Sequence, residues 1–210
     1  MIHIATVDLT PLPEDVYSGL YRLASQERRQ QADRCLKPAD ARRCIVADGL
    51  LRYVLRHTIG TDQVTLARTQ RGKPFLPDLP DFHFNLSHSG GWVVIGWADR
   101  PVGIDVETFR PREGKDALAR RFFHADEQTY LADARDGEWL SRFFEIWTKK
   151  ESYLKYLGTG IDRPLNSFSV FDALGAGFDT RRLDDAMLTL CAEDPVCQII
   201  PLTTEMLLPE

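Results

Sequence analysis

Asp105 and Glu107 are the residues of this chain whose type and spacing point most directly to chemistry. They lie two positions apart in the segment VGIDVE, residues 102–107, and side chains of a β-strand alternate between its two faces. Both carboxylates therefore share one face, where like charges raise each other's pKa unless a cation lies between them. Their oxygens suit a hard divalent ion such as Mg²⁺. A solvent-facing edge strand with two unpaired acids would give the same pattern.

The segment WTKKESYLK, residues 147–155, adds further charged groups on an expected helix. At about 100° per residue, Lys150 falls inside the apolar stripe of this helix, where a lysine is costly unless it is paired. Glu151 and Lys155 lie one turn apart at the edge of the stripe and so share a face. The alternative is a surface salt bridge between these two residues, with Lys150 extending its ammonium group to solvent.

A third group of polar residues is suited to phosphate binding. It comprises Lys73 in the segment GKP, and Ser87 and His88 in the segment FNLSHSG, residues 84–90. Hydroxyls, a histidine and glycines at a strand end can donate hydrogen bonds to phosphate oxygens, although an ordinary hairpin with a buried histidine would look alike. The chain contains no P-loop, GxSxG or HExxH motif. Carboxylates, cations and a phosphate cradle together favour a phosphoryl-type transfer.

The pattern of apolar residues predicts an α+β chain that holds these segments in two similar halves. Helices are expected at 14–35, 39–58, 115–134 and 137–157, and strands at 61–67, 82–88, 92–98, 102–107, 165–171 and 186–192. Residues 71–80 are rich in proline and are expected to form a loop. Helices followed by strands occur twice, so residues 1–100 and 101–210 form the predicted halves, the second poorer in strands.

Composition limits the possible partners. The chain has 210 residues, with 26 Lys and Arg against 31 Asp and Glu, and its net charge of −5 argues against nucleic-acid binding. Residues 22–56 carry nine basic and four acidic side chains, which indicates a site for a small anion or an acidic partner. No apolar run approaches the roughly 18 to 20 residues that span a bilayer, and the first twenty residues do not resemble an export signal. The four cysteines lack CxxC spacing, so free thiols in a cytoplasmic protein without membrane contact are expected.

The three segments occur in an order and spacing that resemble a known family. FNLSHSGGW, VGIDVE and WTKKESYLK, together with GKPFLPDLPDFHFNLSHS and RPLNSFSVF, are similar to motifs of the surfactin-type 4′-phosphopantetheinyl transferases. The resemblance implies a pseudo-dimer of two α+β halves with coenzyme A, or an acylated coenzyme A, in the cleft between them. It also implies transfer of the phosphopantetheine arm to a serine of an acyl or peptidyl carrier protein, with release of 3′,5′-ADP. One chain contains both halves, so a monomer is expected.

The resemblance assigns roles to particular residues of this chain. The implied ligands of Mg²⁺, or alternatively of Mn²⁺, are Asp105, Glu107 and Glu151. Glu151 is also the implied base that deprotonates the incoming serine. The implied contacts of the diphosphate are Lys155 and His88, supported by Lys150. The implied contacts of the adenine nucleotide, including its 3′-phosphate, are Arg28, Arg43, Lys73 and Ser87.

Three features depart from the family pattern. Gln31 stands where a second basic residue is expected, Cys44 stands where a small hydroxyl is expected, and the stretch after Phe171 is short. Binding of the 3′-phosphate would therefore depend on Arg28 and Arg43. None of the departures removes an implied metal ligand.

Carrier recognition is expected at the segment RRFFH, residues 120–124. Arg120 and Arg121 would steer an acidic carrier, unless Phe122 and Phe123 are simply core residues. Two other functions remain as alternatives. A Mg²⁺-dependent pyrophosphohydrolase would explain the carboxylates and cations but not the WTKKES context, and a binding module without catalysis would leave the intact polar residues unexplained.

Overall fold

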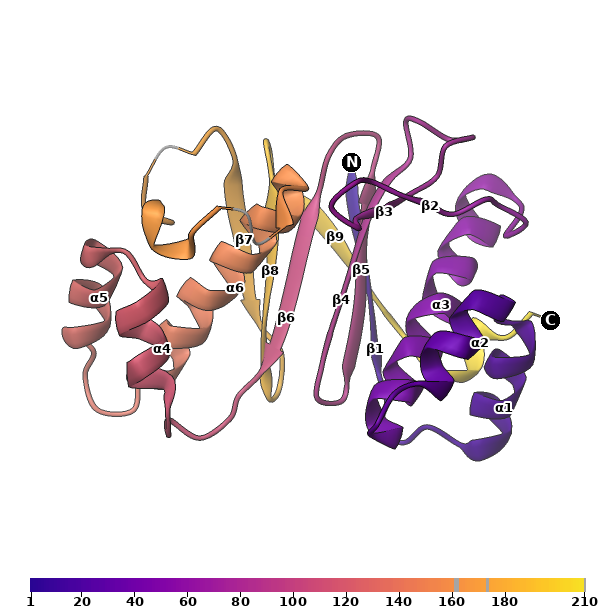
Figure 1. The fold of residues 1–210 in the computed structure, drawn as a ribbon, viewed down its shortest axis with the longest axis horizontal. Helices are drawn as coiled ribbons and strands as arrows, with labels where there is room; N and C mark the ends of the chain where they lie inside the picture. Colours follow the sequence, from indigo (N-terminus) through magenta and orange to yellow (C-terminus); the bar gives the residue numbers. More distant parts are fainter. Residues whose placement is uncertain (161–162, 173, 210) are drawn as a thin grey trace.

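The computed structural model describes residues 1–160, 163–172 and 174–209, and its elements form four layers (Figure 1). Two β-sheets lie in the middle, with the helices of residues 14–59 on one outer side and those of residues 115–157 on the other. The expected α+β fold of two halves is therefore confirmed. None of the described helices is both long and apolar enough to cross a membrane.

The first half contains a four-stranded sheet in the order β4-β5-β1-β9. Its strands are β1 (Ile2–Asp8), β4 (His83–Ser89), β5 (Trp92–Ala98) and β9 (Cys197–Leu202). β5 runs antiparallel to both of its neighbours, β4 and β1, whereas β9 runs parallel to β1. The hairpin expected from the FNLSHSGGW segment is confirmed, because β4 and β5 pair along their whole length.

Three helices cover the outer face of this sheet: α1 (Glu14–Leu23), α2 (Gln26–Asp33) and α3 (Pro38–Ile59). The long helix α3 buries Ile45 and Leu50 in the core that it shares with the sheet. One continuous helix was expected over 14–35, but Ser25 divides it, because its hydroxyl accepts a hydrogen bond from the backbone N–H of Arg28 at 3.1 Å. Ser25 is thereby the N-cap of α2, the helix that carries Arg28.

The second half contains a three-stranded antiparallel sheet in the order β6-β8-β7, so its described residues form fewer strands than the first half, as expected. Its elements are β6 (Gly103–Thr108), β7 (Gly177–Arg182), β8 (Ala186–Ala192), α4 (Lys115–Phe122), α5 (Ala125–Ala132) and α6 (Trp139–Leu157). Helix α6 packs directly on β6 because Gly103 has no side chain. A Cβ atom there would lie 2.0 Å from the carbonyl oxygen of Ser152.

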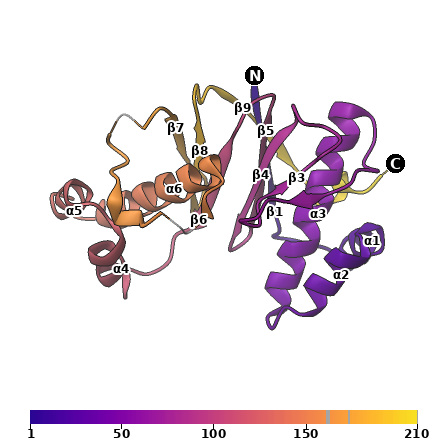
Figure 2. The same cartoon turned by 45° about the horizontal axis from the view of Figure 1, so that its top comes forward.

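The apolar faces of the two sheets meet in the centre of the molecule. Val102, Ile104 and Val106, which were expected to point inward, are at most 1% exposed and pack in one cluster with Ile2 and Ile4 of β1. β4 and β6, each at the edge of its own sheet, lie side by side in both views (Figures 1 and 2). The opposite face of β6, which carries Asp105, is turned toward α6.

Several expectations about local structure are wrong. The strand expected at 61–67 is reduced to β2 (Ala67–Arg68), which pairs with β3 (Pro74–Phe75) inside the expected loop. The helix expected over 115–134 is broken between α4 and α5, where His124 and Glu127 form a capping box. The strand expected at 165–171 is a 3₁₀ turn over Leu165–Ser167.

The chain returns to the first half after β8. β9 pairs with β1, and the 3₁₀ turn Glu205–Leu207 contacts α3, where Arg56 donates a hydrogen bond to the carbonyl oxygen of Leu207 at 2.8 Å. Residues 197–207 of the second predicted half therefore pack on the first half. The exchange of one strand couples the two halves, which also share the central core.

Candidate active site

A cleft of about 530 Å³ opens between the halves and contains most of the residues that were expected to do chemistry. β4, β6 and α6 form its walls, and α2 contributes a further side. Its lining includes seven of the expected residues: Arg28, Ser87, His88, Asp105, Glu107, Glu151 and Lys155. The other three, Arg43, Lys73 and Lys150, are not part of this lining.

Asp105 lies at the centre of the cleft wall and is only 4% exposed. Its Oδ1 accepts hydrogen bonds from Lys155 Nζ at 2.7 Å and from the hydroxyl of Ser87 at 2.9 Å. Its Oδ2 is buried and has no hydrogen-bond partner among the described residues. A buried carboxylate oxygen without a partner is costly, so this atom is suited to a cation that arrives with a ligand.

Glu107 and Glu151 share the electrostatic field of Asp105. Burial raises the pKa of Glu107, and the charge of Asp105 raises it further, while a 2.6 Å hydrogen bond from Ser89 opposes the shift. Burial is also the main cause of the raised pKa of Glu151, followed by the charge of Asp105. The expected repulsion between neighbouring carboxylates is therefore present, and a cation between them would relieve it.

The three carboxylates form an open arrangement rather than a finished metal shell. Within residues 1–160, 163–172 and 174–209, no group of three or more His, Cys, Asp or Glu side chains is drawn together closely enough to hold a metal ion by itself. Asp105 Oδ1 and Glu107 Oε2 are instead occupied by hydrogen bonds. The chemistry of the donors fits a hard divalent cation, and the ligand would have to complete its coordination.

Lys155 is the cation of the cleft lining that pairs with Asp105. Its ammonium group donates to Asp105 Oδ1, to the hydroxyl of Ser87 at 3.0 Å and to the carbonyl oxygen of Ile104 at 3.1 Å. Its side chain remains 28% exposed. The alternative of a surface pair with Glu151 is not what the structure shows, because the ion pair of Lys155 is with Asp105.

Lys150 is placed differently from the expected diphosphate support. Its side chain is 1% exposed and pairs with Glu127 of α5 at 2.8 Å. Its ammonium group also donates to the carbonyl oxygens of Leu165 and Phe168, both at 2.7 Å, so its three donors are all used. We therefore revise its role: Lys150 holds the segment after α6 in place, and this explains why residues 165–167 form a turn instead of a strand.

His88 and Arg43 lie next to one another at one side of the cleft. His88 is exposed at the surface of the molecule, yet desolvation by the surrounding protein lowers its pKa, and the positive charges of Arg43 and Lys155 lower it further. Arg43 donates to the carbonyl oxygen of Gly90 at 2.8 Å and pairs with Asp40. Arg43 thus stabilises the turn that follows β4, two residues after His88, and it is not part of the cleft lining.

Lys73 lies beyond the carboxylates, where it lines a second hollow of about 140 Å³ that shares Glu151 and Lys155 with the cleft. Its ammonium group donates to the carbonyl oxygen of Lys155 at 2.6 Å, near the end of α6. Burial lowers the pKa of Lys73. The structure therefore brings Lys73 to the backbone of α6, and the GKP segment is joined to the WTKKESYLK segment.

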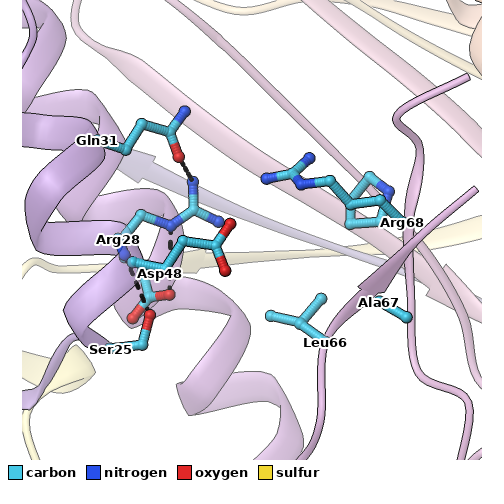
Figure 3. Close-up of a pocket in the computed structure, with 9 residues that line it drawn as sticks. Ser25, Arg28, Gln31, Asp48, Leu66, Ala67 and Arg68 are labelled. Carbon is cyan, nitrogen blue, oxygen red and sulfur yellow. Dashed lines mark hydrogen bonds and ion pairs between the residues drawn. The ribbon is translucent and has the colours of Figure 1, made fainter.

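Arg28 occupies the opposite end of the cleft, where a hollow of about 220 Å³ continues outward (Figure 3). Its guanidinium group donates to Gln31 Oε1 at 3.1 Å and lies 3.4 Å from Asp48 Oδ1. In Figure 3, Arg68 of β2 points toward Arg28 from the facing wall. Two guanidinium groups on opposite walls suit this hollow to an anion, and Glu27 and Asp48, which also line it, offset part of their positive charge.

Both polar departures from the family pattern meet at Arg28. Gln31 accepts its hydrogen bond, and Cys44 Sγ lies 3.8 Å from the same nitrogen, Nη1. Burial raises the pKa of the Cys44 thiol, while its contact with Arg28 opposes the shift. Gln31 and Cys44 therefore orient the arginine, although neither adds a charge of its own.

The sequence analysis did not single out several residues in or beside the cleft. Arg68 and Trp147 line the cleft, and Asn85 and Ser89 contact β6 beside it. Ser89 was counted only among the hydroxyls of the phosphate-binding segment, and the other three were given no part in binding. Arg68 lies in a stretch without a helical or strand-like pattern of apolar residues, so nothing in the sequence assigned it to the site. A signal did exist for β4, because Asn85, Ser87 and Ser89 are small or short polar residues at every second position, alternating with Phe84, Leu86 and His88.

Comparison with known proteins decides the family. A profile described as "4'-phosphopantetheinyl transferase, N-terminal" matches residues 10–99, and one described as "4'-phosphopantetheinyl transferase superfamily" matches residues 101–199. The 4′-phosphopantetheinyl transferase Sfp of Bacillus subtilis is 35% identical over 162 residues, which are 76% of this chain and 71% of the relative. This chain belongs to the 4′-phosphopantetheinyl transferase family.

Two further relatives support the assignment of this chain to the transferase family. The 4′-phosphopantetheinyl transferase psf-1 of Bacillus pumilus is 39% identical over 147 residues, covering 69% of this chain and 62% of the relative. The 4′-phosphopantetheinyl transferase HetI of Nostoc sp. is 34% identical over 166 residues, covering 76% and 70%. The resemblance inferred from the motifs is confirmed, and the structure shows that all three motif segments of the transferase line the same cleft.

Proposed function

We propose that this transferase moves the 4′-phosphopantetheine group of coenzyme A, or of an acylated coenzyme A, to a serine of an acyl or peptidyl carrier protein and releases 3′,5′-ADP. The main observation behind the proposal is the arrangement of polar groups around Asp105, which we call the Asp105 corner of the cleft. One oxygen of this carboxylate is fixed and the other is buried with no hydrogen-bond partner in the described part of the chain, while Glu107 and Glu151 line the same cleft. Family membership supplies the reaction type, and this corner supplies a place for it.

The residues at this corner fit a divalent metal ion. Asp105, Glu107 and Glu151 would hold Mg²⁺, or Mn²⁺, through hard carboxylate oxygens, and the bound ion would neutralise charge on the diphosphate of coenzyme A. The raised pKa values of the two glutamates support this assignment, because they reflect desolvation and repulsion that a cation would relieve.

Lys155 and His88 are placed to hold the diphosphate. In the proposed reaction the serine oxygen forms a bond to the β-phosphorus, and the bond from this phosphorus to the bridging oxygen breaks. Negative charge then grows on the oxygen that leaves with the α-phosphate. The ammonium group of Lys155 is fixed by Asp105, Ser87 and the carbonyl oxygen of Ile104, so it would stabilise this charge through its own positive charge or by exchanging one of these hydrogen bonds for a phosphate oxygen.

Glu151 is the proposed acceptor of the serine proton. It lies on α6, lines the cleft, and has a raised pKa because it is buried beside Asp105. A carboxylate with a raised pKa is a stronger base than an exposed one, and this suits it to take a proton near neutral pH, directly or through water. Its proton would leave to solvent after 3′,5′-ADP departs.

The hollow in Figure 3 is the proposed site of the 3′-phosphate. Arg28 and Arg68 face it from opposite walls and would bind phosphate oxygens with charge-assisted hydrogen bonds. Arg43 and Lys73 would act indirectly. Arg43 holds the turn at Gly90, and Lys73 holds the backbone of Lys155. In this arrangement the first half supplies most of the nucleotide contacts, and the second half supplies the carboxylates.

The carrier protein is proposed to dock beside α4. Phe122 is half-buried, and its ring meets that of Trp147, a cleft residue, edge to face at 6.1 Å. Phe123 is 1% exposed and belongs to the core, so only Phe122 of this pair remains for docking. Arg120 and Arg121 are exposed and would attract an acidic carrier. The cleft lining comes from a single chain, which supports action as a monomer.

Intact-protein mass spectrometry tests the proposed reaction. An apo carrier protein is incubated with the transferase, coenzyme A and Mg²⁺, and a parallel reaction contains EDTA. We expect the carrier to gain the mass of one phosphopantetheine arm only where Mg²⁺ is free. Coenzyme A that is cleaved in the absence of a carrier would instead indicate a pyrophosphohydrolase, and no turnover with any carrier would indicate a binding module.

A further inference from the structure

The edges of β4 and β6 are joined by side chains rather than by a backbone ladder. Alternate side chains of β4 accept hydrogen bonds from alternate backbone N–H groups of β6. The pairs are Asn85 Oδ1 with Ile104 N at 2.9 Å, Ser87 Oγ with Val106 N at 3.3 Å, and Ser89 Oγ with Thr108 N at 3.2 Å. These three pairs, which we call the polar ladder, satisfy the free edge of β6 and bind one half to the other.

Two members of the polar ladder also hold the carboxylates. The hydroxyl of Ser87 donates to Asp105 Oδ1 at 2.9 Å, and the hydroxyl of Ser89 donates to Glu107 Oε2 at 2.6 Å. A serine hydroxyl has one proton to donate, so in each case the proton is committed to a carboxylate. Ser87 therefore cannot donate to the nucleotide while it holds Asp105, and its expected binding role is replaced by one of orientation.

Ser89 is fixed from its other side as well. Its oxygen accepts the N–H of Thr108 and lies 3.3 Å from the hydroxyl of Thr108, so a chain of hydrogen bonds runs from Thr108 through Ser89 to Glu107. Ser89 is only 5% exposed and does not line the cleft. It can therefore act on a ligand only through Glu107.

We propose that Ser89 is a positioning residue of the transfer reaction, which fixes one oxygen of Glu107 so that the carboxylate is presented to the metal ion. Ser87 does the same for Asp105 on the neighbouring rung of the polar ladder. This inference rests on the metal site proposed above. Hydrogen-bonded partners that orient metal-binding carboxylates typically contribute about 10- to 100-fold to metal affinity or activity.

The chain contains a matched control in Ser169. Its hydroxyl also donates to a carboxylate at 2.6 Å, that of Asp126, and also accepts a backbone N–H, that of Phe171 at 3.1 Å. It is fully buried, but it belongs to the segment after α6 and is not part of the cleft lining. Substitution of Ser169 by alanine removes an equivalent pair of hydrogen bonds without touching the carboxylates of the cleft.

The experiment measures Mn²⁺ binding from the electron paramagnetic resonance signal of free Mn²⁺, with coenzyme A present and carrier protein left out. Ser89→Ala is expected to weaken Mn²⁺ binding about tenfold. Ser89→Thr keeps the hydroxyl and is expected to stay within about threefold of the wild type. Ser169→Ala is expected to bind Mn²⁺ as the wild type does, and thermal melting shows whether each variant is folded.

Two results would overturn the role of Ser89. One is a Ser89→Ala variant that binds Mn²⁺ with wild-type affinity. The other is an equal loss of Mn²⁺ affinity in Ser89→Ala and Ser169→Ala, which would show that both substitutions act through general destabilisation. The Asp105→Asn variant separates this failure from failure of the metal site itself. If Asp105→Asn binds Mn²⁺ as tightly as the wild type, the proposed metal site is wrong; if it binds weakly while Ser89→Ala is normal, only the role of Ser89 is wrong.

Discussion

Helix α6 carries two lysine–carboxylate pairs of nearly the same length, on opposite sides of the helix. Lys150 lies 2.8 Å from Glu127, with side chains 1% and 0% exposed, and Lys155 lies 2.7 Å from Asp105, with side chains 28% and 6% exposed. We call the first pair closed, because the hydrogen bonding of its carboxylate is complete. Glu127 also accepts the N–H groups of His124 and Val170, so both of its oxygens have partners.

The second pair is open, because Asp105 Oδ2 has no partner among the described residues. A closed buried pair has no capacity left for a ligand, and its contribution is to fix the chain. An open pair retains an unsatisfied oxygen that only an added cation or donor can satisfy. In this molecule the completeness of the hydrogen bonding, rather than burial or charge alone, distinguishes the structural pair at Lys150 from the pair at Lys155, which we propose to be functional.

Asp105→Asn tests the open pair and is expected to have the largest effect. The amide keeps the shape of the side chain but loses the charge that pairs with Lys155 and that, in the proposed function, holds a metal ion. The rate of transfer to a carrier protein should fall about 1000-fold. Initial rates are followed by the mass of the carrier, and circular dichroism should show an unchanged fold. The exposed Asp15→Asn variant on α1 is the control, and near-normal transfer by Asp105→Asn contradicts the assignment.

Lys150→Met tests the closed pair and should act on stability. It leaves Glu127 as an unpaired buried charge, so the free energy of unfolding should fall by about 3 kcal/mol. The double variant Lys150→Met with Glu127→Gln should recover part of this loss, because the stranded charge is removed. Urea unfolding measures both. A Lys150→Met protein of normal stability but no transfer activity would place this lysine in the chemistry after all.

Arg28→Ala tests the far end of the cleft. The Michaelis constant for coenzyme A should rise about tenfold, because a charge-assisted contact with the 3′-phosphate is lost. For 3′-dephospho-coenzyme A the rise should be about threefold or less. Arg29 is the control, since it lies on the same helix and donates to the backbone carbonyls of Arg22 and Ala24. Equal effects of Arg28→Ala on both substrates would show that it does not contact the 3′-phosphate.

The stability of the metal-free protein should depend on pH through Glu151, and this effect should be the smallest. Burial and Asp105 raise its pKa in the folded state, so the folded protein binds the proton more tightly than the unfolded chain. The free energy of unfolding therefore falls as pH rises from the unfolded-state pKa, about 4.3, through the raised folded-state pKa.

Glu151→Gln removes this dependence and shows its sign. In EDTA the variant should be more stable than the wild type at about pH 8, and the difference should shrink toward about pH 4. Urea midpoints at the two pH values measure it, with Glu145→Gln on the same helix as the control. A difference that does not change with pH would mean that Glu151 is not electrostatically strained.

Local patterns predicted the residues of the cleft better than their partners. The alternation of VGIDVE correctly separated the buried Val102, Ile104 and Val106 from Asp105, and the helical stripe correctly required Lys150 to be paired. The partner, Glu127, is 23 positions away, and nothing in the pattern near either residue connects them. Lys150 also donates hydrogen bonds to the carbonyl oxygens of Leu165 and Phe168, in the segment where a strand was expected and the structure has a turn.

The joint between the halves could not be predicted from periodicity. β9 is separated from β1 by nearly the whole chain, so its parallel pairing depends on the folded core and not on any local signal. Ser87 was assigned to the nucleotide on the strength of the resemblance, whereas its single proton is committed to Asp105. Such assignments depend on hydrogen-bond geometry, which composition and spacing do not contain.

The central claim is that the open pair at Asp105 is completed by a metal ion. Anomalous diffraction from crystals soaked with Mn²⁺ and coenzyme A tests it most directly. The account predicts one Mn²⁺ peak, bounded by carboxylate oxygens of Asp105, Glu107 and Glu151 and by oxygens of the diphosphate. Bound coenzyme A with no Mn²⁺ peak at Asp105, or with Mn²⁺ bound only elsewhere, would contradict it.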